Sequence, residues 1–94
     1  MLDPAAHDTL ILIEHADTVT VKRGADKITV PDWVAELVNC GFTNDEGRLV
    51  ELYRTHVKSP DDTLKIVIFA SILVGWSRQQ TSERLQAVIQ RHTH

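Results

Sequence analysis

Five histidines and one cysteine are the residues that could bind a metal ion, and their spacing predicts no such site. The histidines are His7, His15, His56, His92 and His94, and the cysteine is Cys40. A structural zinc ion needs four nitrogen or sulfur ligands at close spacing. His92 and His94 flank a single residue, but Cys40 and His56 fall on different predicted helices, at no zinc-site spacing. We therefore expect neither a metal nor a cofactor.

Catalytic side chains are equally hard to find. A nucleophilic Cys40 would need a neighbouring base and a depressed pKa, and the sequence indicates neither. Asp61 and Asp62 are explained as carboxylates at the start of a helix, where the helix dipole favours them. The four glycines are scattered over turns and caps and form no phosphate-binding loop. We expect a protein that is not an enzyme.

Residues 60–91 have the pattern of a helix-turn-helix. A short turn that contains Gly75 separates two predicted helices. In a DNA major groove, arginine reads guanine and glutamine reads adenine, so Arg78 and Gln79 have a physical rationale there. The candidate contact residues, for DNA or for a partner protein, are Arg78, Gln79, Ser82 and Arg84, with Lys22 and Arg23 at a predicted hairpin tip, where a wing would touch phosphates.

Several features oppose this DNA-binding interpretation. The first helix of the pair is unusually apolar, and Arg84 stands where many such motifs place a packing residue. The hairpin precedes the motif, and the net charge of −3 repels a polyanion. The alternative interpretation is a pair of core helices with a solvated face. Trp33 and Trp76, near predicted helix ends, are core anchors or, if exposed, interface anchors.

Length and composition predict one small soluble domain spanning residues 1–94. The apolar share of 43% and the charged share of 24% are those of globular proteins. A single cysteine excludes an intramolecular disulfide, and the first residues lack the pattern of a signal peptide. The longest apolar stretch, residues 64–76, is too short to cross a membrane. We expect a cytoplasmic protein that does not bind membranes.

Charge is distributed unevenly along the chain. Residues 1–47 carry nine acidic and three basic side chains, a net of −6, whereas residues 48–94 carry four acidic and seven basic, a net of +3. An acidic half joined to a basic half suits self-association or a charged partner. Ordinary scatter of surface charge is the alternative explanation.

The first third of the chain indicates strands. Pro4 could open a helix, but residues 9–13 are rich in β-branched side chains and favour a buried strand, so residues 4–14 remain open between the two. Residues 18–22 and 28–30 alternate apolar and polar side chains around Arg23-Gly24-Ala25-Asp26, which predicts a hairpin that ends at Pro31.

Helical patterns fill the remainder. The first helix, from about Trp33, is expected to end at Gly41 as a glycine C-cap, and Thr43 with Glu46 has the spacing of a capping box for the next. Ser59 and Pro60 open a helix to about Val74 that is apolar nearly all round, which places it at the centre of the core. Ser77 with Gln80 repeats the capping-box spacing and opens the last helix.

We expect an α+β fold in which a hairpin, or three strands, packs on three or four short helices, the last two forming a helix-turn-helix-like pair. The function expected first is that of a small regulatory or inhibitory protein that binds another protein, such as an adaptor, an anti-activator or a mobile-element inhibitor. The alternative is a DNA-binding transcriptional regulator. A homodimer formed by an apolar helix face is also expected, because pairing gives a short chain more buried area.

Overall fold

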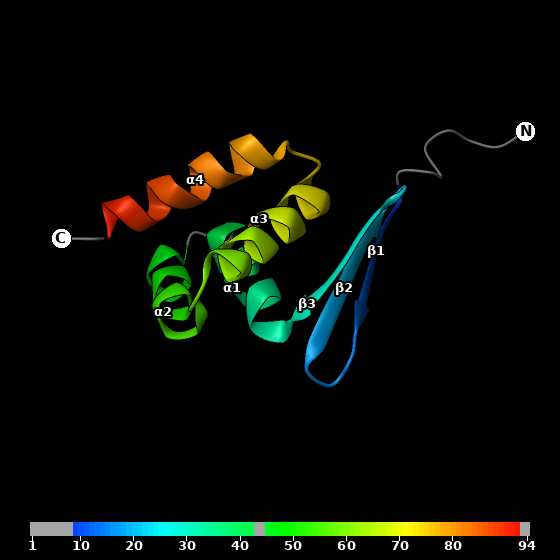
Figure 1. The fold of residues 1–94 in the computed structure, drawn as a ribbon, viewed down its shortest axis with the longest axis horizontal. Coiled ribbons are helices and arrows are strands. Elements are labelled where there is room, and N and C mark those ends of the chain that lie inside the picture. Colours follow the sequence, from blue (N-terminus) through cyan, green and yellow to red (C-terminus); the bar gives the residue numbers. More distant parts are fainter. Residues whose placement is uncertain (1–8, 43–44, 93–94) are drawn as a thin grey trace, which may run out of the picture.

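Three strands followed by four helices make up the part of the chain that the computed structural model describes, residues 9–42 and 45–92 (Figure 1). The predicted α+β class is confirmed, and the third strand is present. The strands are β1 Leu10–Glu14, β2 Thr18–Arg23 and β3 Asp26–Pro31. The helices are α1 Asp32–Phe42, α2 Glu46–His56, α3 Pro60–Val74 and α4 Arg78–Arg91.

The sheet is an antiparallel meander with β2 in the centre. Val21 of β2 lies opposite Leu12 of β1 and Ile28 of β3. Gly24 takes a φ of 61° in the turn between β2 and β3, a left-handed conformation that glycine adopts at little cost. The predicted hairpin is therefore confirmed.

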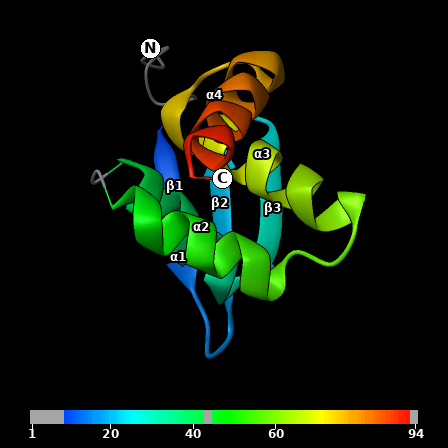
Figure 2. The same ribbon diagram turned by 90° about the vertical axis from the view of Figure 1, so that its left-hand side faces the viewer.

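Helix α3 occupies the centre of the core, as its apolar composition predicted. Phe69 and Ile66 are 1% and 2% exposed, and α3 packs against α1, α4, β2 and β3. From the helical end, the helices lie in front of the sheet (Figure 2). They cover the sheet face that carries Val19 and Val21, both buried.

The turn between α3 and α4 also follows the sequence prediction. Gly75 ends α3 with a φ of 76°, and its N–H donates to the carbonyl oxygen of Ser71 at 2.8 Å. The Gln80 N–H donates to Ser77 Oγ at 3.1 Å, and the Ser77 N–H donates to Gln80 Oε1 at 3.3 Å. This reciprocal pair is the predicted capping box.

Two predicted helix ends are wrong, and a third is correct in position but lacks the expected side-chain hydrogen bond. Gly41 lies inside α1 and does not end it; a Cβ there would come within 2.9 Å of Leu49 Cδ1, so the tip of this α2 side chain would have to shift. The N-cap of α2 is Asp45, which accepts from the Arg48 N–H; Thr43 lies outside the described residues. Ser59 holds the N-cap position of α3, but its side chain makes no capping hydrogen bond.

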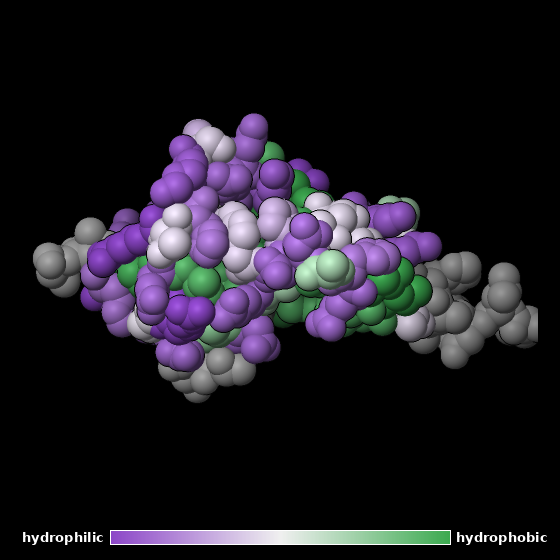
Figure 3. All heavy atoms as spheres, turned by 90° about the horizontal axis from the view of Figure 1, so that it is seen from below, coloured by the Kyte–Doolittle hydropathy of each residue, from purple (hydrophilic) through white to green (hydrophobic). Residues whose placement is uncertain are grey.

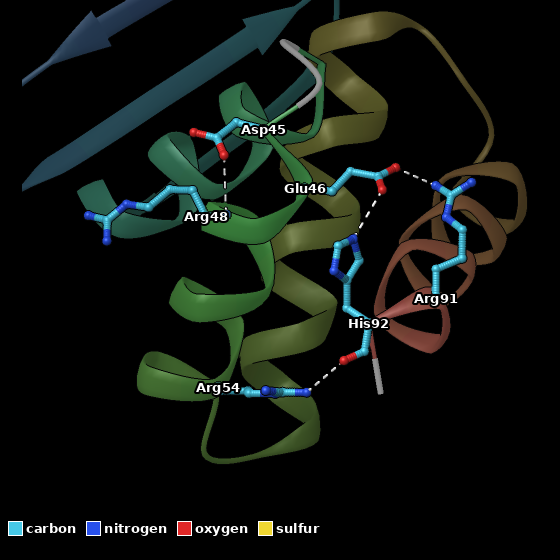
Figure 4. Close-up of polar contacts among 6 residues, drawn as sticks. All are labelled: Asp45, Glu46, Arg48, Arg54, Arg91 and His92. Atoms are coloured by element: carbon cyan, nitrogen blue, oxygen red, sulfur yellow. Dashed lines mark hydrogen bonds and ion pairs between the residues drawn. The ribbon is translucent and has the colours of Figure 1, made fainter. Parts of the chain in front are cut away.

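Some charges of the acidic half and the basic half of the sequence pair with each other within the chain. They do so where the end of α4 lies against the start of α2 (Figure 4). Glu46 forms ion pairs with Arg91 and with His92, the latter at 3.2 Å. Arg54 donates to the carbonyl oxygen of His92 at 3.1 Å. These groups are exposed, so each pair contributes at most about 1 kcal/mol, but together they fix α4 against α2. Among the described residues no helix has the length and apolar character needed to cross a membrane.

Candidate functional site

The β1 strand is the most unusual surface of the molecule. Residues 10–14 do form a strand, but the expectation that it is buried is wrong, since all five residues are exposed. Leu10, Ile11, Leu12 and Ile13 have exposed fractions of 38%, 43%, 47% and 45%. Hydrophobic side chains gather at the sheet end of the molecule in Figure 3. Because side chains alternate along a strand, Leu10 and Leu12 lie on the helix side of the sheet and Ile11 and Ile13 on the other side. The strand therefore exposes apolar side chains on both faces, and exposed apolar surface of this kind marks an interaction surface.

The position of β1 in the fold explains its exposure. It is an edge strand that pairs with β2 alone, whereas α1 and α3 pack over β2 and β3. On the sheet face turned away from the helices, β2 and β3 carry polar side chains: Lys22 and Thr29 are exposed, and the buried Thr20 shares a hydrogen bond of 2.7 Å with Thr29. Of the three described strands only β1 is apolar on both faces, so its composition fits a strand that is covered on both sides.

An open groove of about 630 Å³ lies on the helix side of β1, and we call it the β1 groove. Apolar side chains of three elements line it, Leu12 of β1, Val19 of β2, and Phe69 and Leu73 of α3. Helix α1 forms the opposite wall. The α1 residues that line this wall are Asp32, Ala35, Glu36 and Asn39. The groove therefore offers an apolar strip bordered by a helix with polar side chains.

The charged side chains that line the β1 groove are acidic. Glu14, Asp32 and Glu36 contribute carboxylates, with His15 beside them, and neither lysine nor arginine is among the residues lining it. Glu36 accepts a hydrogen bond from Arg48 at 3.1 Å, which offsets one of these charges. The remaining potential is negative and attracts a basic partner.

A second groove, which we call the hairpin groove, lies between the β2–β3 turn and the start of α4. It measures about 380 Å³, and Arg23, Lys27 and Arg78 line it together with Asp26 and Trp76. The Arg23 guanidinium donates to the carbonyl oxygen of Leu73 at 3.0 Å, while its Nε is buried and has no hydrogen-bond partner among the residues that the structure describes. Arg23 thus closes the C-terminal end of α3 and joins the hairpin to the α3–α4 turn.

The structure brings only some of the predicted contact residues together. Arg78 and Arg23 share the hairpin groove, but Lys22 points to the opposite face of the sheet from Val21 and Arg23. Gln79 donates to Glu83 at 3.2 Å, and Ser82 is half-buried. With Asp26 in the groove and Glu83 on α4, acidic groups interrupt the basic face.

The two tryptophans differ in their surroundings. Trp33 is half-buried against the core and stacks on His56, with ring centroids 5.0 Å apart. Trp76 is 37% exposed, and the Arg84 guanidinium lies 5.4 Å from the centre of its ring. Of the two candidate anchors, Trp76 is the one with a solvent-facing ring, and a cation already covers part of it.

Cys40 is buried, with 9% of its surface exposed. Burial raises the pKa of its thiol, and the nearby carboxylates of Asp45 and Glu36 raise it further. A nucleophilic cysteine needs the opposite shift, because the thiolate is the reactive form. Across residues 9–42 and 45–92, no three histidine, cysteine or carboxylate side chains gather in a way that could hold a metal ion.

In comparisons with known proteins, no family model, curated protein or solved structure matches this chain. The two grooves and β1 are the surfaces of the described chain that point to a function. Of the candidate residues predicted from the sequence, Arg23, Arg78 and Trp76 line the hairpin groove, whereas the β1 groove was not predicted. The signal for it was the uninterrupted apolar run of residues 10–13, which differs from the alternating pattern of the two strands that follow.

Proposed function

We propose that this chain is a small regulatory or inhibitory protein that acts by binding another protein at the β1 groove. The observation that carries the proposal is the apolar strip of Leu12, Val19 and Phe69 beside an edge strand whose four large side chains are exposed. Apolar patches of this kind on a small soluble fold are typical of protein interfaces. The partner segment that fits is apolar with basic side chains at its border.

Two further features support a protein partner over DNA. The carboxylates of Glu14, Asp32 and Glu36 border the β1 groove and repel a polyanion. The basic face around α4 is interrupted by Asp26 and Glu83, whereas phosphate binding is favoured by a contiguous positive surface.

The test places a photo-crosslinking residue at Asn39, an exposed position on the α1 wall of the β1 groove. The captured protein is identified, purified and titrated against the full chain. We expect Asn39→Arg to weaken this binding about tenfold or more, because a long cation then occupies the groove and repels the basic partner.

Gln86→Arg is the matched control, since Gln86 is also exposed on a helix but lies on α4, away from this groove. It adds the same charge and is expected to leave the affinity unchanged. Binding that survives Asn39→Arg at full strength, or falls equally in both variants, would contradict the proposal.

Nucleic-acid binding is the second candidate, because Arg23, Lys27 and Arg78 meet in the hairpin groove beside the start of α4. Under the protein-binding proposal we expect no sequence-preferring binding of duplex DNA at physiological salt in fluorescence anisotropy. A DNA-binding protein would instead lose affinity with a log–log salt slope of about −0.9 per phosphate contact. In that case Arg78→Ala would relax the base preference by roughly 1–3 kcal/mol, and this result would favour the second candidate.

A further inference from the structure

The outer edge of β1 has a defined set of unpaired backbone groups. The His15 N–H donates to the carbonyl oxygen of Thr18 at 2.9 Å, which sets the alternation along the strand. Ile11 and Ile13 have the same parity as His15, so their N–H and C=O groups face β2. Those of Leu10, Leu12 and Glu14 therefore face away from β2, along the free edge of the sheet.

Most of this edge lacks the features that keep strands of monomeric proteins from pairing. Such edges are usually protected by lysine, by proline, by a bulge or by an inward-pointing charge. The paired register of β1 with β2 runs unbroken from Leu10 to Glu14. The exception is Glu14, a charge at the last position that points to the helix side of the sheet. Both the backbone and the side chains of β1 are suited to a further strand.

We infer that the free edge of β1 pairs with β1 of a second copy of this chain, antiparallel and with Leu12 on the twofold axis. In this register Leu12 of one copy lies opposite Leu12 of the other, and Leu10 lies opposite Glu14. These are the outward-facing residues, so the two strands exchange about six backbone hydrogen bonds. The result is a continuous six-stranded sheet.

The side chains of the strand suit this twofold register. On the face away from the helices, Ile11 of one copy lies opposite Ile13 of the other, in the closer type of cross-strand pair. The two Glu14 carboxylates lie at opposite ends of the paired strands, about 14 Å apart, beyond the screening length at physiological salt. All five residues of one strand meet a residue of the other, so one association covers two identical apolar edges.

This pairing uses the backbone edge of β1, whereas the partner proposed for the β1 groove binds on its helix side, and the two share Leu12. Dimerisation and partner binding are measured separately, so either can fail alone. A pair of five-residue strands is a small interface, below the roughly 1,200 Å² typical of stable complexes, and a weak dimer is expected. Sedimentation of the purified full chain should show a monomer at low micromolar concentration and a dimer towards about 1 mM.

Three variants test the edge. Leu12→Pro removes an outward N–H that makes no bond to β2, and Leu12→Lys places a charge on the patch. Both should raise the dissociation constant about tenfold or more while the thermal melt stays cooperative. Leu64→Lys is the matched control, since Leu64 is 48% exposed but lies on α3, and it should dimerise as the wild type does.

The register is tested by cysteine substitution under mild oxidation with glutathione disulfide. Leu12→Cys places two thiols across the axis at a Cα separation of about 5.5 Å, which suits a disulfide, and should give a covalent dimer. Leu10→Cys places them about 14 Å apart and should not. A wild-type monomer at every concentration, or equal cross-linking at both positions, would overturn the inference, and a monomer that still binds its partner at Asn39 would leave the proposed function intact.

Discussion

Phe69→Ala should destabilise the protein by about 3–5 kcal/mol. Phe69 is 1% exposed at the centre of α3, and its loss removes apolar contacts and leaves a cavity that the surrounding helices cannot fill. A domain of this length has a total stability of roughly 5–15 kcal/mol, so a large fraction of it would be lost. Urea denaturation followed by circular dichroism gives the free energy of unfolding directly.

The matched control is Leu64→Ala on the same helix. Leu64 is 48% exposed, so its truncation should change the free energy of unfolding by no more than about 0.5–1 kcal/mol. A change below about 1 kcal/mol for Phe69→Ala would mean that α3 is not the centre of the core and that the architecture is wrong.

The helical half of the fold was predictable because its signals are local. The Ser77–Gln80 capping box and the left-handed Gly75 lie within a few residues of each other, and both are present as expected. Gly41 carries the same glycine signal, yet it stays inside α1. Gly41 lies beside Leu49 of α2, and packing between helices has no local signature in the sequence.

The exposure of β1 is a second feature that the local sequence pattern could not predict. Residues 9–13 favour a strand, and a strand apolar on both faces is normally buried. Whether anything covers it depends on how the helices are placed, and here they pack over β2 and β3. The sequence pattern therefore predicted the strand, but it could not predict that the strand is exposed in the part of the chain that the structure describes.

The sequence also could not predict which of the candidate contact residues share one surface. Lys22 and Arg23 are adjacent in sequence, and alternation along β2 sends them to opposite faces of the sheet. Arg23 reaches the end of α3 and meets Arg78 in the hairpin groove, while Lys22 does not. Proximity along the chain was sufficient to find the hairpin tip but not to assign its side chains to one surface.

Substituting alanine for glycine at two positions should change stability in opposite directions, and Gly75→Ala is the destabilising case. Its φ of 76° costs an L-residue about 1–2 kcal/mol, and the added Cβ would lie 3.6 Å from a terminal nitrogen of Arg23. That distance is an ordinary van der Waals contact, so the cost comes from the left-handed backbone of the turn between α3 and α4. We expect a loss of about 1–2 kcal/mol in urea denaturation, with no change in helix content.

Gly47→Ala is expected to stabilise the protein, and it serves as the control for Gly75→Ala. Gly47 is an exposed residue in the first turn of α2, and a Cβ there meets nothing within 4 Å. Alanine reduces the conformational entropy of the unfolded chain and favours the helix, so stability should rise by about 0.4–1 kcal/mol. Because the chemical change is identical at both positions, the difference of roughly 2 kcal/mol measures the left-handed turn at Gly75. Equal effects of the two substitutions would mean that residue 75 does not adopt this turn and that α3 and α4 are joined in another way.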